Sequence, residues 1–383
     1  MRKSGLWLLL MLLLAYACRT DDDIVLPMTD DLGRHTATAV DGMYVLCEGN
    51  MGANKATLDY LDLSGDTVRY WKNIFPSRNP QQVMMLGDVG NDCQIYGSRL
   101  WLVINCSNKV EVCTADSAFS LGHVDVPNCR YVCFDGGHAY VSSYVGPVNG
   151  ESVLGSVYRI DTLTLRITGQ VAVGYQPEEM AIVDGKLYVA NSGGYEAIQG
   201  RGYDRTVSEV DLQTFQEVRR IDVAPNLFRL RADRHGQLWV SSRGNYSGMP
   251  SRLYLLHPDG DGQMQLADSV DVPVSDLAFH GDSLCFMGVS YDEMWQATTH
   301  LGIIDVSTGN LVSRQLLQPS DDYELQTPYG LMVHPQNGDI YVMDATNYVS
   351  SGRLLCFDQA GNFRWQTTTG DIPGHACWKM KQP

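Results

Sequence analysis

Residues 180–190, with the sequence MAIVDGKLYVA, carry the signal that decides the fold. Two short apolar segments flank Asp184-Gly185, a dipeptide that favours the tight turn of a β-hairpin. Both segments are rich in β-branched or aromatic residues, which favour strands over helices. The stretch therefore predicts two antiparallel strands joined by a two-residue turn.

The second strand of this hairpin recurs along the chain as a short apolar segment with an aromatic or cysteine residue at its centre. Consecutive centres lie 39–57 residues apart, close to the length of one four-stranded blade of a β-propeller. The seven centres are Tyr44, Trp101, Tyr140, Tyr188, Trp239, Cys285 and Tyr341. This repeat predicts seven blades.

The two ends of the chain complement each other. The fourth copy continues with alternating apolar residues over 206–212 and 217–223, which completes a four-stranded antiparallel unit. The first copy has candidates only for the last three strands, over 43–49, 57–63 and 67–74. The late segment PGHACW, residues 373–378, looks like the start of an innermost strand elsewhere in the repeat. We therefore expect an all-β, seven-bladed β-propeller over residues 40–380, closed by a C-terminal strand that joins the first blade.

The N-terminus has the features of an export signal. A basic start at Arg2-Lys3 precedes an apolar run over 6–14, which is too short to span a bilayer. The sequence AYAC at 15–18 resembles a bacterial lipobox, so residues 1–17 are expected to be a signal peptide and Cys18 a lipidated first residue. Residues 18–39 begin with the acidic stretch RTDDD and are expected to form a flexible tether. A lipid anchor would then be the chain's attachment to a membrane.

Composition narrows the choice of partners. The chain has 28 basic and 44 acidic residues, a formal net charge of −16, and no basic cluster of the kind that binds phosphate backbones. Nucleic acid is therefore not an expected partner. Nine cysteines remain besides Cys18, and most lie within apolar strand patterns, where cysteine behaves as a small hydrophobic residue. We expect them to belong to the core.

Strand polarity predicts where a site lies. In an antiparallel blade, the loops between the second and third strands open on the same face as the connections between blades. Here the loops at 50–54, 105–108, 143–152, 191–205, 242–251, 290–299 and 344–351 are long or varied, whereas the turns of the opposite face are minimal. Elaborated loops on one face are typical of a binding face.

These loops and inter-blade connections are rich in amides and aromatic rings, which suit a large, polar and mostly uncharged ligand. The alternative is that asparagine forms turns and tyrosine caps the blades. The candidate ligand-binding residues are Asn50, Asn54, Asn105, Asn108, Asn128, Arg130, Tyr144, Gln176, Glu178, Asn191, Tyr195, Asn226, Phe228, Arg229, Arg243, Tyr246, Tyr291, Tyr329 and Asn347.

Several strings on this face resemble one family. They are EGNMGANKA at 48–56, GDVGND at 87–92, INCSNKVEV at 104–112, VGYQPEEM at 173–180, YVANSGGY at 188–195 and GDIP at 370–373. Together they make residues 40–378 similar to the BtuG family of cobalamin-capturing surface lipoproteins of Bacteroidota, within the larger YncE-type propeller superfamily.

The resemblance implies that cobalamin or a related corrinoid binds on one face as a transported ligand, with no cofactor required. It also implies delivery to a TonB-dependent outer-membrane transporter, on which the propeller would dock as a lid at the cell surface, as a monomer apart from that complex.

Two other functions stay open at this point. Some propellers hydrolyse lactones with a calcium ion in the central channel, and Glu178, Asn226 and Asp276 offer suitable oxygen ligands. A propeller that binds glycans or proteins is the other alternative. The sequence contains no nucleophile elbow, metal-binding histidine pair or phosphate loop, so a non-catalytic binding protein is the preferred interpretation.

Overall fold

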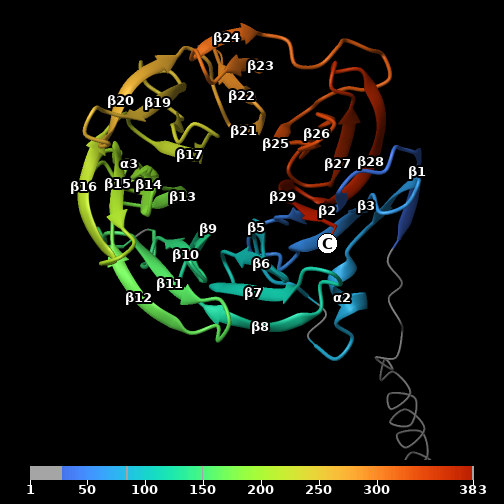
Figure 1. The fold of residues 1–383 in the computed structure, drawn as a ribbon, viewed down its shortest axis with the longest axis horizontal. Helices are drawn as coiled ribbons and strands as arrows, with labels where there is room; N and C mark the ends of the chain where they lie inside the picture. Colours follow the sequence, from blue (N-terminus) through green and yellow to red (C-terminus); the bar gives the residue numbers. More distant parts are fainter. Residues whose placement is uncertain (1–27, 83–84, 149, 293, 295, 382–383) are drawn as a thin grey trace, which may run out of the picture.

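A computed structural model describes residues 28–82, 85–148, 150–292, 294 and 296–381. Figure 1 shows seven antiparallel sheets arranged as blades around one central axis. Six sheets have four strands, and the sheet of the first blade has five. The seven-bladed β-propeller predicted from the repeat is thereby confirmed.

The strands are given blade by blade, followed by the two short helices. The first blade contains β29 (Pro373–Met380), β2 (Val40–Cys47), β3 (Thr57–Asp62), β4 (Thr67–Trp71) and β1 (Thr29–Arg34); the second, β5 (Gly90–Tyr96), β6 (Arg99–Ile104), β7 (Lys109–Thr114) and β8 (Ser120–Asp125); the third, β9 (Cys129–Asp135), β10 (His138–Ser143), β11 (Ser156–Asp161) and β12 (Ile167–Ala172); the fourth, β13 (Pro177–Val183), β14 (Lys186–Asn191), β15 (Thr206–Asp211) and β16 (Gln216–Asp222). The fifth contains β17 (Leu227–Ala232), β18 (Leu238–Ser242), β19 (Arg252–Pro258) and β20 (Met264–Val270); the sixth, β21 (Asp276–His280), β22 (Ser283–Tyr291), β23 (Ala297–Asp305) and β24 (Asn310–Ser313); the seventh, β25 (Pro328–Val333), β26 (Ile340–Asp344), β27 (Ser351–Phe357) and β28 (Phe363–Asp371); the helices are α2 (Ile74–Arg78) and α3 (Gly194–Ile198).

The C-terminal strand closes the ring, as predicted. Strand β29 pairs antiparallel with β2, in a register that runs from Val40 opposite Met380 to Cys47 opposite Pro373. It lies next to the axis, in the place that the other blades fill with their own first strand (Figure 1). Closure leaves the first blade without an open inner edge, which would otherwise present unpaired backbone groups.

Part of the segment expected to be a flexible tether forms a strand. Strand β1 adds a fifth strand to the outer edge of the first blade by pairing with β4. Asp30 there lies 3.0 Å from the ammonium of Lys72 and accepts a hydrogen bond from the hydroxyl of Thr367. The expected signal peptide and Cys18 lie outside the described residues. Within the part of the chain that the structure describes, no helix has the length and apolarity needed to span a membrane.

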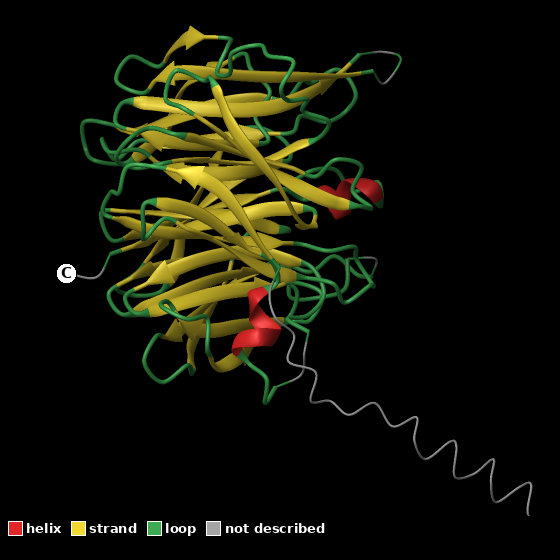
Figure 2. Cartoon of the chain, turned by 90° about the vertical axis from the view of Figure 1, so that its right-hand side faces the viewer, coloured by secondary structure: helices red, strands yellow, loops and turns green. Residues whose placement is uncertain are grey.

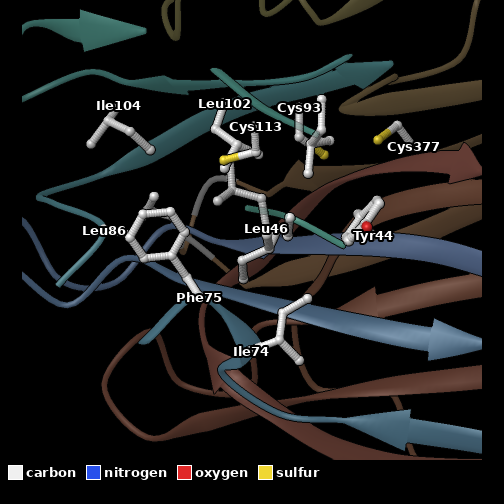
Figure 3. Packing of buried hydrophobic residues seen from close by; sticks show 13 residues of the cluster. Tyr44, Leu46, Ile74, Phe75, Leu86, Cys93, Leu102, Ile104, Cys113 and Cys377 are labelled. Atoms are coloured by element: carbon white, nitrogen blue, oxygen red, sulfur yellow. The ribbon is translucent and has the colours of Figure 1, made fainter. Parts of the chain in front are cut away.

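The core consists of apolar layers between neighbouring blades. Figure 3 shows one of them, where Tyr44 and Leu46 of the first blade pack against Cys93 and Leu102 of the second. Each large side chain fully buried in this way contributes about 1.5–3 kcal/mol. Seven cysteines are buried, Cys133 is intermediate and Cys106 is exposed, and none of these nine forms a disulfide. The expected core role of cysteine therefore holds for most of them and fails for Cys106.

Buried carboxylates also join successive blades. In three of the blades, a carboxylate at the start of the innermost strand accepts a hydrogen bond from a backbone N–H of the innermost strand in the next blade. The pairs are Asp92 with Val132 at 3.0 Å, Glu179 with Leu230 at 3.0 Å, and Asp276 with Leu331 at 2.8 Å. Such charge-assisted bonds are stronger than neutral ones, so these side chains hold the ring together near its axis.

The two faces of the ring differ as the sequence predicts. In Figure 2, α3 projects from one face, whereas the described end of β29 points to the other. Helix α3 lies in the loop between β14 and β15, and the face that carries this kind of loop is called the long-loop face below. The hairpin of β22 and β23 extends this face further, because its pairing continues to Tyr291 opposite Ala297.

His334 directly follows β25, on the face of the ring that carries the short turns. It is expected to make the free energy of unfolding depend on pH. Its Nδ1 accepts hydrogen bonds from the backbone N–H groups of Gln336 and Asn337, both at 3.2 Å. Because an accepting Nδ1 carries no proton, these bonds favour the neutral imidazole. Burial lowers the pKa of His334 from 6.5 to about 4. The unfolded chain therefore takes up a proton first, and stability falls as the pH drops from about 6.5 to 4.

The measurement is urea denaturation between pH 4 and 7, with His334→Asn as the comparison. The wild type is expected to lose about 1–3 kcal/mol more than the variant over this range. The fluorescence of Trp378, whose ring lies 5.2 Å from that of His334, provides a local signal. Equal pH dependence in the two proteins would show that His334 does not titrate in this way.

Candidate functional site

Side chains from three blades converge on one buried carboxylate of the long-loop face. Glu178, near the start of β13, is 2% exposed. Its Oε2 accepts hydrogen bonds from Nε and Nη2 of Arg130 at 3.3 and 3.2 Å. Its Oε1 accepts from the hydroxyls of Tyr144 at 2.6 Å and Ser192 at 3.3 Å, and lies 3.9 Å from Nη1 of Arg243. These five residues are called the Glu178 cluster below.

The electrostatics keep this carboxylate ionised. Burial by itself raises the pKa of Glu178, but the charges of Arg130 and Arg243 and the hydrogen bonds from Tyr144 and Arg130 outweigh that effect. The pKa of Glu178 therefore lies below its ordinary value. Conversely, burial raises the pKa of the Tyr144 phenol well above 10, so this phenol stays a hydrogen-bond donor. The cluster is a fixed, charged anchor between the third, fourth and fifth blades.

The guanidinium groups of this region stack on aromatic rings. The guanidinium of Arg243 lies 3.5 Å from the ring centroid of Phe228, and that of Arg229 lies 4.6 Å from the same ring. The guanidinium of Arg130 lies 4.9 Å from the ring of Tyr144. Stacking of this kind orients a guanidinium and leaves its N–H edge available for planar acceptors.

A second charged group lies deeper along the axis. Arg229 is 4% exposed; its Nε lies 3.3 Å from Oδ1 of Asp276 and donates to the carbonyl of Ser275 at 3.1 Å. Arg231 donates to Asp276 and to Glu179, each at 2.9 Å. Two arginines and two carboxylates thus balance each other. Their role is to join the fourth, fifth and sixth blades rather than to face a ligand.

The amides of the second and third blades form a lined hollow. Asn105 donates to Oδ1 of Asn128 at 2.9 Å, and the backbone N–H of Asn128 donates to Oδ1 of Asn108 at 2.7 Å. They border a hollow of about 280 Å³ that also contacts Cys106 and residues 145–147. These three predicted residues therefore come together, and they serve both the loop structure and a polar surface.

Other predicted amides make hydrogen bonds within the fold. Asn191 is fully buried and donates to the backbone carbonyl of Thr206, while Gln176 bonds both the N–H and the carboxylate of Glu196. Asn226 donates to the carbonyl of Gly244 at 3.2 Å. Asn347 accepts three hydrogen bonds from its own loop, at residues 349 and 350. At these positions the amide groups hold the loops and strands of the long-loop face together.

On the first and seventh blades, the predicted residues join two neighbouring loops. Asn50 donates to the backbone carbonyl of Tyr348, and the ring of Tyr329 lies edge-on to that of Tyr348 at 5.7 Å. Asn54 adopts a left-handed conformation with φ of 54° and donates to the sulfur of Met85 at 3.0 Å. These residues therefore connect the loops of the first, second and seventh blades.

Several loops of the long-loop face carry exposed apolar side chains. Tyr195, Tyr246 and Tyr291 were predicted, and the structure leaves these residues 36%, 59% and 55% exposed. Tyr195 also lies edge-on to Tyr144 of the Glu178 cluster, at 6.2 Å. Further exposed side chains in the same set of loops are Met51, Ile198, Met249, Met294, Tyr348 and Val349. Exposed apolar groups gathered around a polar centre are typical of a binding surface.

Two of the three residues considered as calcium ligands are engaged by arginines. Glu178 binds Arg130, and Asp276 binds Arg229 and Arg231, whereas Asn226 donates to the backbone through its Nδ2 and not through the oxygen that would bind calcium. Across the described ranges, no group of three or more histidine, cysteine, aspartate or glutamate side chains is placed to hold a metal ion.

Sequence reasoning missed Ser192, Tyr131, Glu179 and Arg231. The ring of Tyr131 lies between Phe228 and His375, at centroid distances of 6.3 and 6.2 Å, and so links blades on opposite sides of the axis. For Glu179 and Arg231 a signal was present, because each is a charged residue within an inner strand that is otherwise largely apolar. Such residues cannot face the apolar layers and must face the axis.

No protein-family model and no curated protein sequence matches this chain. Solved structures do match, at low identity. Hydrazine synthase from Kuenenia stuttgartiensis has a TM-score of 0.61 at 16% identity, over 75% of this chain and 89% of that chain. A candidate 6-phosphogluconolactonase from Bacteroides fragilis has 0.58 at 12%, over 90% and 100%, and a quinonprotein alcohol dehydrogenase-like protein from Bacteroides thetaiotaomicron has 0.57 at 12%, over 89% and 78%.

These similarities establish the architecture. The chain is a seven-bladed β-propeller with neighbours among quinoprotein-like and 6-phosphogluconolactonase-like propellers. One fold of this kind carries many functions, so the neighbours' activities do not transfer at these identities.

Proposed function

We propose that this protein is a non-catalytic lipoprotein of the outer membrane that captures a corrinoid such as cobalamin and delivers it to a TonB-dependent transporter. The observation that carries the proposal is the long-loop face itself: exposed tyrosines surround a polar centre of stacked arginines and ordered amides. The BtuG-like strings of the sequence lie in loops and inter-blade connections of the same face, and one of them includes Tyr195. The lipid anchor, the location and the transporter rest on the sequence resemblance.

The chemistry of a corrinoid suits this face. Its macrocycle has two broad apolar sides, and its rim carries many amides. The exposed rings of Tyr195, Tyr246 and Tyr291 offer apolar area together with a phenol, at a low cost in conformational entropy. Asn108, at the rim of the amide hollow, is exposed and offers neutral hydrogen-bonding groups. Because rigid strands hold these loops, little affinity is lost in ordering them.

The test is calorimetric titration of the purified protein with cyanocobalamin. We expect binding in the micromolar range or tighter, and about ten-fold weaker binding by Tyr246→Ala, because truncation of an aromatic contact typically costs 1 kcal/mol or more. Phe119→Ala is the matched control, since Phe119 is 54% exposed but lies in the turn before β8, on the opposite face.

Absence of heat and of co-elution at micromolar concentrations would refute corrinoid capture. A glycan array and a lactone-hydrolysis assay would then distinguish the two remaining functions.

A further inference from the structure

The hydrogen-bond donors of the Arg243 side chain have no partner among the described residues. Its guanidinium stacks on Phe228 and lies 3.9 Å from Oε1 of Glu178, beyond hydrogen-bond distance. In the described part of the chain, its side chain makes no hydrogen bond, although a guanidinium has five N–H donors. The side chain is 36% exposed, so a ligand on the long-loop face can reach it.

The carboxylate of Glu178 has no free acceptor position for Arg243. Each carboxylate oxygen accepts about two hydrogen bonds. Oε1 already accepts from Tyr144 and Ser192, and Oε2 accepts both bonds from Arg130. Arg243 is therefore a second cation beside an acceptor that is already saturated.

The cluster consequently carries an excess positive charge. Arg130 and Arg243 contribute two positive charges against the one negative charge of Glu178, in a chain whose net charge is −16. The deeper group does not offset this excess, because Arg229 and Arg231 are balanced by Glu179 and Asp276. A half-buried cation that shares its one carboxylate with another arginine attracts the negative charge of a ligand.

We propose that Arg243, supported by Arg130, forms a subsite for one monoanionic phosphodiester-type group of the captured ligand. A guanidinium binds two oxygens of such a group at once, and the stack on Phe228 fixes its plane for that contact. The subsite rests on the proposed function, since in cobalamin this group is the phosphodiester that links the nucleotide base to the macrocycle. Tyr246, three residues further along the same loop, is exposed and placed to cover the neighbouring organic part.

The experiment compares cobalamin with cobinamide, a corrinoid that lacks the phosphodiester and the nucleotide base. Calorimetry is done on the wild type, Arg243→Gln and Arg243→Lys. Arg243→Gln is expected to weaken cobalamin binding about 10- to 100-fold and to change cobinamide binding less than about two-fold. Arg243→Lys should fall between, because it keeps the charge but loses the planar pair of donors.

Arg234→Gln is the matched control. Arg234 is exposed, lies in the turn between β17 and β18 on the opposite face, and is 3.9 Å from Asp282. It should leave the binding of both corrinoids unchanged. Thermal melts of all variants show whether they are folded, and cobinamide binding gives a second check on the integrity of the face.

A separate arm with dimethyl phosphate, a bare monoanionic diester, distinguishes the failure of the subsite from that of the proposed function. At millimolar concentrations it should raise the Tm of the wild type and not of Arg243→Gln. If this holds while neither corrinoid binds, corrinoid capture is refuted and the anion subsite stands. If Arg243→Gln weakens both corrinoids equally and dimethyl phosphate has no effect, the subsite is refuted and capture stands. No response in either arm refutes both.

Discussion

Glu178→Ala is expected to lower the free energy of unfolding by about 3–5 kcal/mol. Removing one partner of a buried ion pair leaves the other charge without compensation, and this costs far more than the pair itself contributes. Here the loss is compounded, because Glu178 joins the third blade, through Arg130 and Tyr144, to Ser192 of its own blade and Arg243 of the fifth. Two arginines and a buried phenol would lose their common partner.

Urea denaturation followed by tryptophan fluorescence measures this effect. Asp222→Ala is the control, since Asp222 forms an exposed ion pair with Arg205 at 2.9 Å. Exposed pairs are worth about 0–1 kcal/mol, so this variant should differ little from the wild type. Equal losses in the two variants would contradict the structural role of the Glu178 cluster.

The pH dependence gives a second check on Glu178. Because its folded pKa lies below its ordinary value of 4.5, the stability that it contributes is fully present above about pH 4.5. This contribution is lost as the pH falls further through the folded pKa. The difference between the wild type and Glu178→Ala should therefore shrink below about pH 4.5 and stay constant between pH 5 and 7.

Truncation after residue 371 is expected to abolish cooperative folding. It removes β29, the innermost strand of the first blade, and thereby exposes the edge of β2 along its whole length. Backbone hydrogen bonds contribute about 0.5–1.5 kcal/mol each, and the buried Cys377 and the packed ring of Trp378 are lost as well. A folded domain is stable by only about 5–15 kcal/mol, so these losses consume most or all of its stability.

Near-UV circular dichroism, thermal melts and size-exclusion chromatography follow the truncated chain. A shorter deletion of residues 382–383 serves as the control and should behave as the full chain does. Adding a synthetic peptide of residues 372–381 should restore part of the tertiary signal, because the peptide supplies the missing strand. A truncated chain that keeps its melting transition unaided would show that ring closure contributes little.

The fold could be predicted because its signals are local and repeated. Apolar alternation marked each strand, turn residues such as Asp184-Gly185 marked each hairpin, and the recurrence of both gave seven blades. Closure by residues 373–380 followed from a missing first strand at one end and a spare one at the other. The strand at 29–34 escaped prediction because it packs as an outer edge strand and carries little apolar patterning: its side chains are exposed or half-buried.

The site was only partly predictable, because partners on different blades are set by proximity in space. The sequence by itself determined the strands, the number of blades, the ring closure and the face that carries the long loops, since hydrophobic periodicity and turn chemistry act between near neighbours in the chain. Only the tertiary structure decided that Asn191 and Asn226 serve the backbone, whereas Arg130 and Arg243 meet at Glu178. The physical reason is that Glu178 lies 48 positions from Arg130 and 65 from Arg243, and these contacts form only when the closed ring brings three blades together around its axis.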